Sequence, residues 1–233
     1  MTDFFRFPHT PHLAWLGDGV PRDDKVLSPQ EAKALLATAV VVEEKLDGAN
    51  LGFSLGPNAE LRSQNRGQYL AEPHAGQFSR LPSWLERHGD ALLQVLTPEL
   101  MLFGEWCAAR HSLAYKGLPD WFLLFDVYDR AAGRFWSTAR RDALAHTAGL
   151  ATVPQVSRGH TTLSALTQQV MSAPSHYRAG QPLEGVVVRR ESAEWCEARA
   201  KLVRPDFTQA IETHWRKRAI EWNRLDHPTP ASA

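Results

Sequence analysis

The sequence predicts an α+β domain in which mostly antiparallel sheets are flanked by helices. Strand-like runs rich in β-branched and aromatic residues recur along the chain, and several follow one another after only a short turn. Short turns join antiparallel strands, whereas parallel strands need a long crossover. Helical patterns lie between groups of strands rather than after every strand, which favours α+β over a parallel α/β sheet.

The N-terminal part predicts a capped helix followed by three strands. Residues 1–30 are mostly irregular and rich in proline. Ser28 and Glu31 have the spacing of a capping box, with a proline at the first helical position, so a helix is expected to about Ala37. Strands are then expected at 39–45, 49–55 and 59–63.

The middle of the chain predicts further strands separated by helices. Leu85, Leu92 and Leu96 share one face of a helix that is expected to begin at Pro82. Helices are also expected near 138–148 and 161–172, and strands at 99–107, 121–128, 183–190 and 198–204.

A final helix is expected near 207–224, and one domain over 1–227, followed by a flexible tail at 228–233. The apolar stripe of this helix would comprise Ile211, Trp215, Ala219 and Trp222. The basic residues on its other faces either grip a phosphodiester backbone or form a solvated surface: Arg216, Lys217 and Arg218.

The composition is that of a globular protein without a global charge. Of the 233 residues, 43% are hydrophobic and 22% are charged, which is enough apolar mass for a sizeable core. Basic and acidic residues balance at 26 each, so any polyanion site must come from local clustering. Cys107 and Cys196 are too few for a disulfide framework and lack metal-ligand spacing. Neither a signal peptide nor a transmembrane run is present, so a cytoplasmic protein without a membrane partner is expected.

Lys45 is the most informative residue of the sequence. It follows a run of three valines and precedes Asp47-Gly48, so it is expected at the end of a strand, facing a tight turn. A lysine in such a position can act as a covalent nucleophile once its ammonium group is deprotonated. The alternative is a surface lysine before an Asp-Gly hairpin turn.

Charged residues also interrupt apolar strand runs, where a core would prefer hydrophobic side chains. Glu105 could bind a ribose hydroxyl or a metal, and Glu184 could bind a divalent cation. The alternative for Glu105 is an ion pair with an arginine in the core. Phe125 suits one wall of a base pocket, or simply the core. The basic residues of these segments could bind phosphate: Arg62, Arg66, Arg199 and Lys201. The alternative is a polar hairpin tip for Arg62 and Arg66, and a solvated edge strand for Arg199 and Lys201. Together with Lys45, these are the parts that nucleotidyl transfer requires.

Six segments in this order resemble the motifs of the covalent nucleotidyltransferases, which include ATP-dependent RNA and DNA ligases and mRNA capping enzymes. They are EKLDGAN (44–50), LRSQNR (61–66), FGEW (103–106), LFDVYD (124–129), LEGVVVR (183–189) and AKLVR (200–204). The nearest likeness is to small bacterial members of the RNA-ligase-2-like branch, which begin with a segment like PHTPHL (8–13). The resemblance covers about residues 7–207 and implies a nucleotidyltransferase (ATP-grasp-like) domain.

The resemblance also implies a role for each matching residue. Lys45 would attack the α-phosphate of ATP and form a lysyl-AMP intermediate, while Lys201 would neutralise that phosphate and help to lower the pKa of Lys45. Glu184 would engage a catalytic Mg²⁺ or Mn²⁺, with Asp47 as a second metal contact. The nucleotide would be held by Glu44 at the adenine edge, by Asp47 and Asn50 at the ribose or phosphate, by Arg62 at phosphate, by Glu105 at the ribose, and by Phe125 and Val187 around the adenine. Arg199 is also expected at the nucleotide, in a position where many relatives have lysine.

The function expected from this resemblance is ATP-dependent joining of RNA 3′-hydroxyl and 5′-phosphate ends. The 29 residues after Arg204 are too few for the OB-fold that DNA ligases and capping enzymes carry there, which lowers both of those alternatives. A third alternative is a non-catalytic module that binds nucleotides or RNA ends. An end-healing kinase or phosphatase is an expected partner if the chain seals ends poorly by itself.

Overall fold

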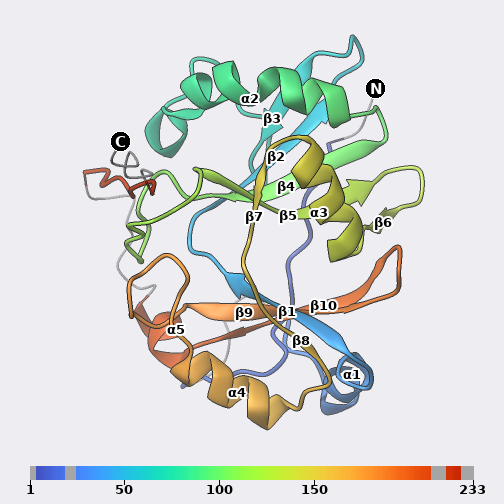
Figure 1. Ribbon diagram of the computed structural model, residues 1–233, viewed down its shortest axis with the longest axis vertical. Coiled ribbons are helices and arrows are strands. Elements are labelled where there is room, and N and C mark those ends of the chain that lie inside the picture. Colours follow the sequence, from blue (N-terminus) through green and yellow to red (C-terminus); the bar gives the residue numbers. More distant parts are fainter. Residues whose placement is uncertain (1–3, 19–24, 211–218, 227–233) are drawn as a thin grey trace, which may run out of the picture.

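Two mostly antiparallel sheets form the centre of the molecule, one above the other in the view of Figure 1. The computed structural model describes residues 4–18, 25–210 and 219–226. One sheet has the strand order β10-β9-β1-β8, and the other has the order β3-β2-β4-β5-β6 with β7 alongside β5. All strand pairs are antiparallel except β5 with β7, as the short connections in the sequence predict.

The elements follow the predicted ones closely through most of the chain. The strands are β1 (Val40–Lys45), β2 (Ala49–Leu55), β3 (Leu61–Gln64), β4 (Leu100–Trp106), β5 (Phe122–Asp129), β6 (Arg134–Phe135), β7 (Ala151–Thr152), β8 (Gln155–Gly159), β9 (Gly185–Glu191) and β10 (Cys196–Val203). The helices are α1 (Pro29–Leu35), a single 3₁₀ turn (Gly76–Phe78), α2 (Leu81–Val95), α3 (Thr138–Thr147), α4 (Leu163–Ser172) and α5 (Pro205–Ala210). Strands β6, β7 and β8 have no counterpart in the sequence-based prediction.

Local sequence explains where the first elements begin and end. Helix α1 starts at the predicted capping box, in which Ser28 Oγ accepts from Glu31 N at 3.2 Å and the Glu31 carboxylate accepts from Ser28 N at 2.8 Å. The predicted extended segment 7–13 lies beside β10, where Lys201 N donates to Pro11 O at 2.8 Å and Leu13 N donates to Lys201 O at 2.7 Å.

Each sheet packs against its own helices and has its own hydrophobic core. Helix α2 covers the outer face of the β3-β2-β4-β5-β6 sheet, while α1 and α4 lie beyond the other sheet (Figure 1). In the first core, the fully buried rings of Phe53 and Trp84 stack with centroids 5.4 Å apart. The second core joins Leu35 of α1 and Val170 of α4 to the apolar residues of β1, β9 and β10. The two outer faces are therefore sealed, and the inner faces remain for polar chemistry.

The predicted final helix, 207–224, is confirmed at its start and wrong at its end. Residues 207–210 belong to α5, whereas residues 219–224 are not helical. Trp222 instead forms a β-bridge with Ala109, and Leu225 one with Leu118. The apolar spacing that suggested a helix is satisfied here by packing of an extended segment on the first core. The other residues of the predicted stripe and basic face lie outside the described residues: Ile211, Trp215, Arg216, Lys217 and Arg218.

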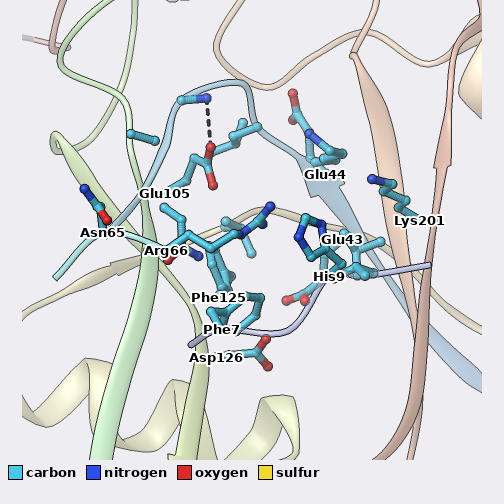
Figure 2. A pocket seen from close by; sticks show the side chains of 18 of the residues that line it. Phe7, His9, Glu43, Glu44, Asn65, Arg66, Glu105, Phe125, Asp126 and Lys201 are labelled. Carbon is cyan, nitrogen blue, oxygen red and sulfur yellow. Dashed lines mark hydrogen bonds between the residues drawn. The ribbon is translucent and has the colours of Figure 1, made fainter. Parts of the chain in front are cut away.

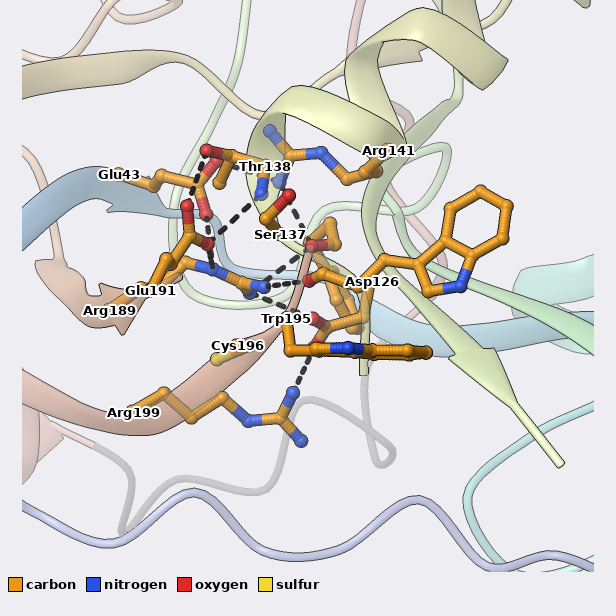
Figure 3. Close-up of polar contacts among 12 residues, drawn as sticks. Glu43, Asp126, Ser137, Thr138, Arg141, Arg189, Glu191, Trp195, Cys196 and Arg199 are labelled. Atoms are coloured by element: carbon orange, nitrogen blue, oxygen red, sulfur yellow. Dashed lines mark hydrogen bonds and ion pairs between the residues drawn. The ribbon is translucent and has the colours of Figure 1, made fainter. Parts of the chain in front are cut away.

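A buried network of charges joins the two sheets (Figure 3). Arg189 on β9 donates to Asp126 Oδ1 on β5 at 2.7 Å, and its Nε lies 3.8 Å from Glu43 Oε2 on β1. Arg141 of α3 lies 2.7 Å from Glu43 Oε1 and donates to Phe125 O at 2.9 Å. All four charged side chains are no more than 2% exposed, so the ion pairs with their partners must compensate for the loss of hydration.

Replacing Arg141 is expected to destabilise the protein strongly. Arg141→Ala leaves the Glu43 carboxylate buried beside one distant guanidinium, so the free energy of unfolding should fall by about 3–5 kcal/mol. Urea unfolding measures this change. Arg134→Ala is the matched control, because Arg134 forms an exposed ion pair with Glu197 at 2.8 Å and should cost less than about 1 kcal/mol. Equal losses in the two variants would contradict the role given to the buried network.

Candidate active site

Lys45 ends strand β1, at the point where the chain leaves one sheet for the other. Strand β1 pairs with β8 and β9, whereas β2 pairs with β3 and β4, so the turn 46–48 crosses between the sheets and closes no hairpin. This excludes the alternative of a surface lysine before a hairpin turn. Lys45 pairs in register with Gly185, and this places Lys45 Nζ 2.5 Å from Oε1 of Glu184. The side chain of Lys45 is 28% exposed and that of Glu184 is 2% exposed.

The crossing turn is held by hydrogen bonds from the region that follows β4. Asp47 Oδ2 accepts from the backbone N–H groups of Ser112 and Leu113, each at 2.7 Å. Asp47 N in turn donates to the hydroxyl of Tyr115 at 2.8 Å. Hydrogen bonds therefore hold both the side chain and the backbone of Asp47 in the turn.

Gly48 completes the turn because no side chain fits there. A Cβ atom at this position would lie 2.6 Å from the backbone oxygen of Trp106, a distance that real Cβ atoms essentially never show. Gly48 N donates to Glu105 Oε1 at 2.8 Å, so the close approach also brings the Glu105 carboxylate to the turn. The requirement for glycine is thus one of space, since β2 must begin directly against β4.

Lys45 has a raised pKa, contrary to the expectation that a nearby cation lowers it. Burial acts to lower the pKa of Lys45, but the carboxylates of Glu184 and Glu105 outweigh it. Lys201 lines the same pocket, but the two neighbouring carboxylates dominate the charge around Lys45. Lys45 is therefore a charged ammonium group at neutral pH.

The two carboxylates near Lys45 hold their protons more tightly than ordinary glutamates. Burial raises the pKa of Glu105 to about 7, against the opposing effect of the Lys45 ammonium. Burial likewise raises the pKa of Glu184, again opposed by Lys45. Glu184 Oε2 is buried and has no hydrogen-bond partner among the described residues. A carboxylate with one bound and one unsatisfied oxygen is suited to accept the lysine proton or to contact a bound cation.

Lys45 opens into a pocket of about 580 Å³ between the two sheets. Phe125 of β5 and Val187 of β9 belong to opposite sheets and both line this pocket, as expected for the two walls of a base slot. Figure 2 shows Lys201 on one side of the pocket, with Glu105 and Arg66 on the other. The pocket thus combines an apolar slot with basic and acidic groups around its rim.

Most of the residues that the sequence assigned to the site meet here. In addition to Lys45, the pocket lining includes Glu44, Asn50, Glu105, Phe125, Val187, Arg199 and Lys201. Glu184 contacts the lysine directly. The roles given to these residues remain predictions, because their positions alone do not identify a ligand.

Two predicted nucleotide contacts are engaged elsewhere in the protein. Arg62 lies outside the pocket lining, where it pairs with Glu60 at the exposed end of β3. Arg199 lines the pocket, but its guanidinium is bound by Asp126 and lies 4.0 Å from the ring centroid of Phe135. A guanidinium held by a carboxylate and an aromatic ring belongs to the buried network rather than to free phosphate-binding groups.

Two predicted carboxylate contacts also have other partners. Asp47 is absent from the pocket lining and binds backbone N–H groups, so none of its contacts supports a role as metal ligand. Glu44 lines the pocket, but one of its oxygens accepts from His176 N at 3.0 Å. The carboxylate of Glu44 is therefore partly committed to the 174–177 loop.

The pocket also contains residues to which the family resemblance gave no role. Arg66 lines it, and its buried Nε has no hydrogen-bond partner among the described residues. Arg66 lies within the LRSQNR motif and was expected to suit phosphate, but the resemblance assigned the phosphate contact to Arg62. His9 lies in the PHTPHL segment, whereas His111 and Gln77, which form a 2.7 Å hydrogen bond, belong to no motif. Only the fold brings these last two residues to the pocket.

The carboxylates of the site fit a divalent cation that is bound mainly by phosphate oxygens and water and only in part by the protein. Among the described residues, no group of three or more His, Cys, Asp or Glu side chains has the geometry to hold a metal ion. Glu184 Oε2 is nevertheless a buried oxygen without a partner in that part of the chain. Mg²⁺ commonly binds through one or two carboxylates together with phosphate oxygens and water, which is the arrangement this site allows.

Comparison with known proteins identifies the family. Residues 38–203 match the RNA ligase family. This range includes five of the six motif segments in full and AKLVR up to Val203, but not PHTPHL. The chain belongs to the RNA ligase family. No curated protein sequence matches it.

Solved structures show the same fold at low sequence identity. An RNA ligase variant from Naegleria gruberi with ATP and Mn has a TM-score of 0.65 and 17% identity, over 91% of this chain and 60% of that one. A second variant of that ligase, without ligand, has a TM-score of 0.62 and 16% identity, over 88% and 57%. An archaeal ATP-dependent RNA ligase has a TM-score of 0.52 and 19% identity, over 85% and 48%. The chain therefore spans less than two thirds of each of these structures.

None of the helices in the described part of the chain combines the length and apolarity that crossing a bilayer requires. 

The raised pKa of Glu105 predicts a specific loss of stability with rising pH. Between the unfolded value near 4.5 and about 7, the folded protein binds more protons than the unfolded chain, so stability falls as pH rises through this window. Glu105→Gln removes this titration while keeping an oxygen for Gly48 N. Relative to the variant, the wild type should lose about 1–3 kcal/mol of unfolding free energy between pH 5 and pH 8, measured in urea. The control Glu86→Gln, at an exposed position of α2, should leave the pH dependence unchanged; parallel curves for wild type and Glu105→Gln would rule out the raised pKa.

Proposed function

We propose that this chain is an ATP-dependent RNA ligase that joins 3′-hydroxyl and 5′-phosphate ends through a lysyl-AMP intermediate. The observation that carries the proposal is Lys45 at the rim of a base-sized slot, 2.5 Å from the buried Glu184 carboxylate and in one pocket with Lys201. Membership of the RNA ligase family supports the substrate class. The Naegleria gruberi structure with ATP and Mn supports ATP as the nucleotide and a divalent cation as the cofactor.

The first step is attack of Lys45 Nζ on the α-phosphorus of ATP. The N–P bond forms, the bond to the bridging oxygen breaks, and pyrophosphate leaves. Glu184 Oε1 is the nearest carboxylate oxygen to Nζ and is placed to take the lysine proton. Lys201, across the pocket, offers positive charge to the phosphate oxygens as the pentavalent transition state forms. Mg²⁺ or Mn²⁺, when bound, neutralises triphosphate charge and favours the departure of pyrophosphate.

Two further transfers complete the reaction. The 5′-phosphate of one RNA end displaces Lys45 from the adenylate, which restores the amine and produces an end joined to AMP by a pyrophosphate linkage. The 3′-hydroxyl of the other end then attacks the RNA phosphate of that linkage, and AMP leaves. Arg66, whose Nε is buried without a partner in the described structure, supplies a second cation to these phosphates.

The two apolar walls of the pocket support a role in holding the base of the nucleotide. Phe125 and Val187 come from different sheets, so the distance between the slot's walls depends on the contact between those sheets. The buried network of Glu43, Asp126, Arg141 and Arg189 fixes that contact directly beneath the slot. Stacking in such a slot contributes about 1–3 kcal/mol per base.

Lys45→Ala is expected to abolish adenylylation. The wild-type chain, incubated with α-labelled ATP and Mg²⁺ or Mn²⁺, should retain label on denaturing electrophoresis, whereas the variant cannot form the N–P bond. Lys33→Ala, at an exposed lysine of α1, is the matched control and should label normally. Substituting GTP or NAD for ATP tests the capping-type alternative. A labelled Lys45→Ala band, or a folded wild-type chain that labels with none of the three nucleotides, would contradict the proposal.

The charged state of Lys45 predicts the pH dependence of this step. Because the neighbouring carboxylates raise the pKa of Lys45, the single-turnover rate should increase with pH, about tenfold per unit below that pKa. Glu184→Gln removes the closest negative charge, so its profile should shift to lower pH even though its maximal rate falls. Quench-flow measurements from pH 6 to pH 10 give both profiles. Coincident profiles would show that Glu184 does not control the proton on Lys45.

Joining assays then separate the possible acceptors. Nicked duplexes and single strands with RNA or DNA at either side of the break should be joined only where the ends are RNA, if the family assignment extends to the substrate. Addition of an end-healing kinase or phosphatase should extend joining to ends that lack a 5′-phosphate or a free 3′-hydroxyl. A chain that adenylylates itself but joins no end would support the alternative of a partner-dependent enzyme.

A further inference from the structure

The extended segment 221–226 has contacts that reach the nucleophile turn, although it lies outside the residues that match the RNA ligase family. It follows the undescribed residues 211–218 and lies against the loop 107–118, which connects β4 to β5. Arg110 N donates to Glu221 O at 2.8 Å, Asn223 N to Ala108 O at 2.9 Å, and Asp226 N to Leu118 O at 2.8 Å. These backbone bonds run the whole length of the loop.

Asn223 is the central residue of this contact. It is 4% exposed, and its side chain uses both ends of the amide. Nδ2 donates to Cys107 O at 2.8 Å and to Ala109 O at 3.4 Å, while Oδ1 accepts from Tyr115 N at 2.9 Å. One side chain thus ties together the beginning and the end of the loop 107–115.

Apolar and aromatic contacts hold Asn223 in place. Trp222 and Leu225, on either side of it, pack against the hydrophobic core of the larger sheet. The guanidinium of Arg80 lies 4.2 Å from the ring centroid of Trp222 and 5.1 Å from that of Trp121. The segment is therefore anchored to the domain at both neighbours of the asparagine.

The loop that Asn223 ties is the one that holds the nucleophile turn. Its Ser112 and Leu113 N–H groups bind the Asp47 carboxylate, and its Tyr115 hydroxyl accepts from Asp47 N. The Tyr115 backbone N–H donates to Asn223 Oδ1, and the Tyr115 hydroxyl accepts from Asp47 N. One residue, Tyr115, therefore links Asn223 to Asp47, and Asp47 is two positions from Lys45.

We propose that Asn223 is a positioning residue for the adenylylation of Lys45, acting through the loop 107–115 and Asp47. This inference rests on the proposed function, because it assigns Asn223 to the first step of that reaction. The physical reason is that attack on phosphorus requires Nζ in line with the leaving oxygen, and an error of about 1 Å costs on the order of 100-fold in rate. The turn 46–48 has no strand partner to hold it, so its geometry depends on the loop.

Substitution of Asn223 tests the proposal through the rate of the first step alone. Asn223→Ala removes all three side-chain bonds, and Asn223→Asp keeps the acceptor for Tyr115 N but faces Cys107 O with an oxygen. In both variants the single-turnover rate of lysyl-AMP formation at saturating ATP should fall about 10- to 100-fold. The half-saturating ATP concentration should change less than about threefold, because no described residue of the segment 221–226 lines the pocket.

Two control variants separate positioning from loss of stability. Glu221→Gln alters the exposed Glu221–Arg110 ion pair in the same segment but leaves its backbone bonds, and should react at the wild-type rate. Val170→Ala opens a cavity in the core of the other sheet and lowers stability without touching the loop. All rates are normalised to the folded fraction measured by circular dichroism at the assay temperature. If Val170→Ala loses rate as Asn223→Ala does, or if both Asn223 variants react at the wild-type rate, the proposal is overturned.

A double-substitution cycle tests the route through Tyr115. Tyr115→Phe removes the hydroxyl that accepts from Asp47 N, so it interrupts the same route as Asn223→Ala. The rate loss of the double variant should therefore be smaller than the product of the two single losses. Independent, multiplicative losses would contradict the route. If the wild-type chain itself forms no lysyl-AMP, the proposed function fails instead. The same cycle is then measured with an amine-specific reagent that modifies Lys45 without ATP. The change in its rate for the double variant should again be smaller than the product of the two single changes.

Discussion

The ion pair between Lys45 and Glu184 is the interaction on which the arrangement of the site depends. It exists because β1 and β9 are neighbours in one sheet, with Lys45 opposite Gly185. Its cost is the burial of a carboxylate, and its consequence is a lysine that stays charged until the reaction removes its proton.

The second constraint is that the chain must pass from one sheet to the other directly after Lys45. The turn that makes this passage has neither strand partner nor room for a side chain at Gly48. Its position is set by bonds to Glu105, Tyr115 and the backbone at 112–113. The larger sheet therefore positions Lys45, which belongs to the smaller sheet. The buried charge network connects the two sheets beside the pocket (Figure 3).

The same reasoning explains why two predicted phosphate contacts differ from what the structure shows. Arg199 occupies a position on β10 that faces the pocket, yet Asp126 and two phenylalanine rings take its guanidinium. Arg62 points to the exposed side of β3, while Arg66, beyond the end of that strand, reaches the pocket. The partner of Arg199 is supplied by the other sheet, whereas that of Arg62 is Glu60, two residues away in the chain.

The sequence by itself determined the fold class, the strand that carries Lys45, and about a third of the residues that line the pocket. These follow from local signals: valine runs, a capping box, Asp-Gly after the lysine, and carboxylates set within apolar strands. Only the tertiary structure decided the contacts of Asp47 with the loop 112–113, the place of His111 and Gln77 at the pocket, and the extended course of 221–226. Those features join residues far apart in the chain, and an apolar spacing such as that around Trp222 is satisfied equally by a helix or by an extended segment until the surface it packs against is known.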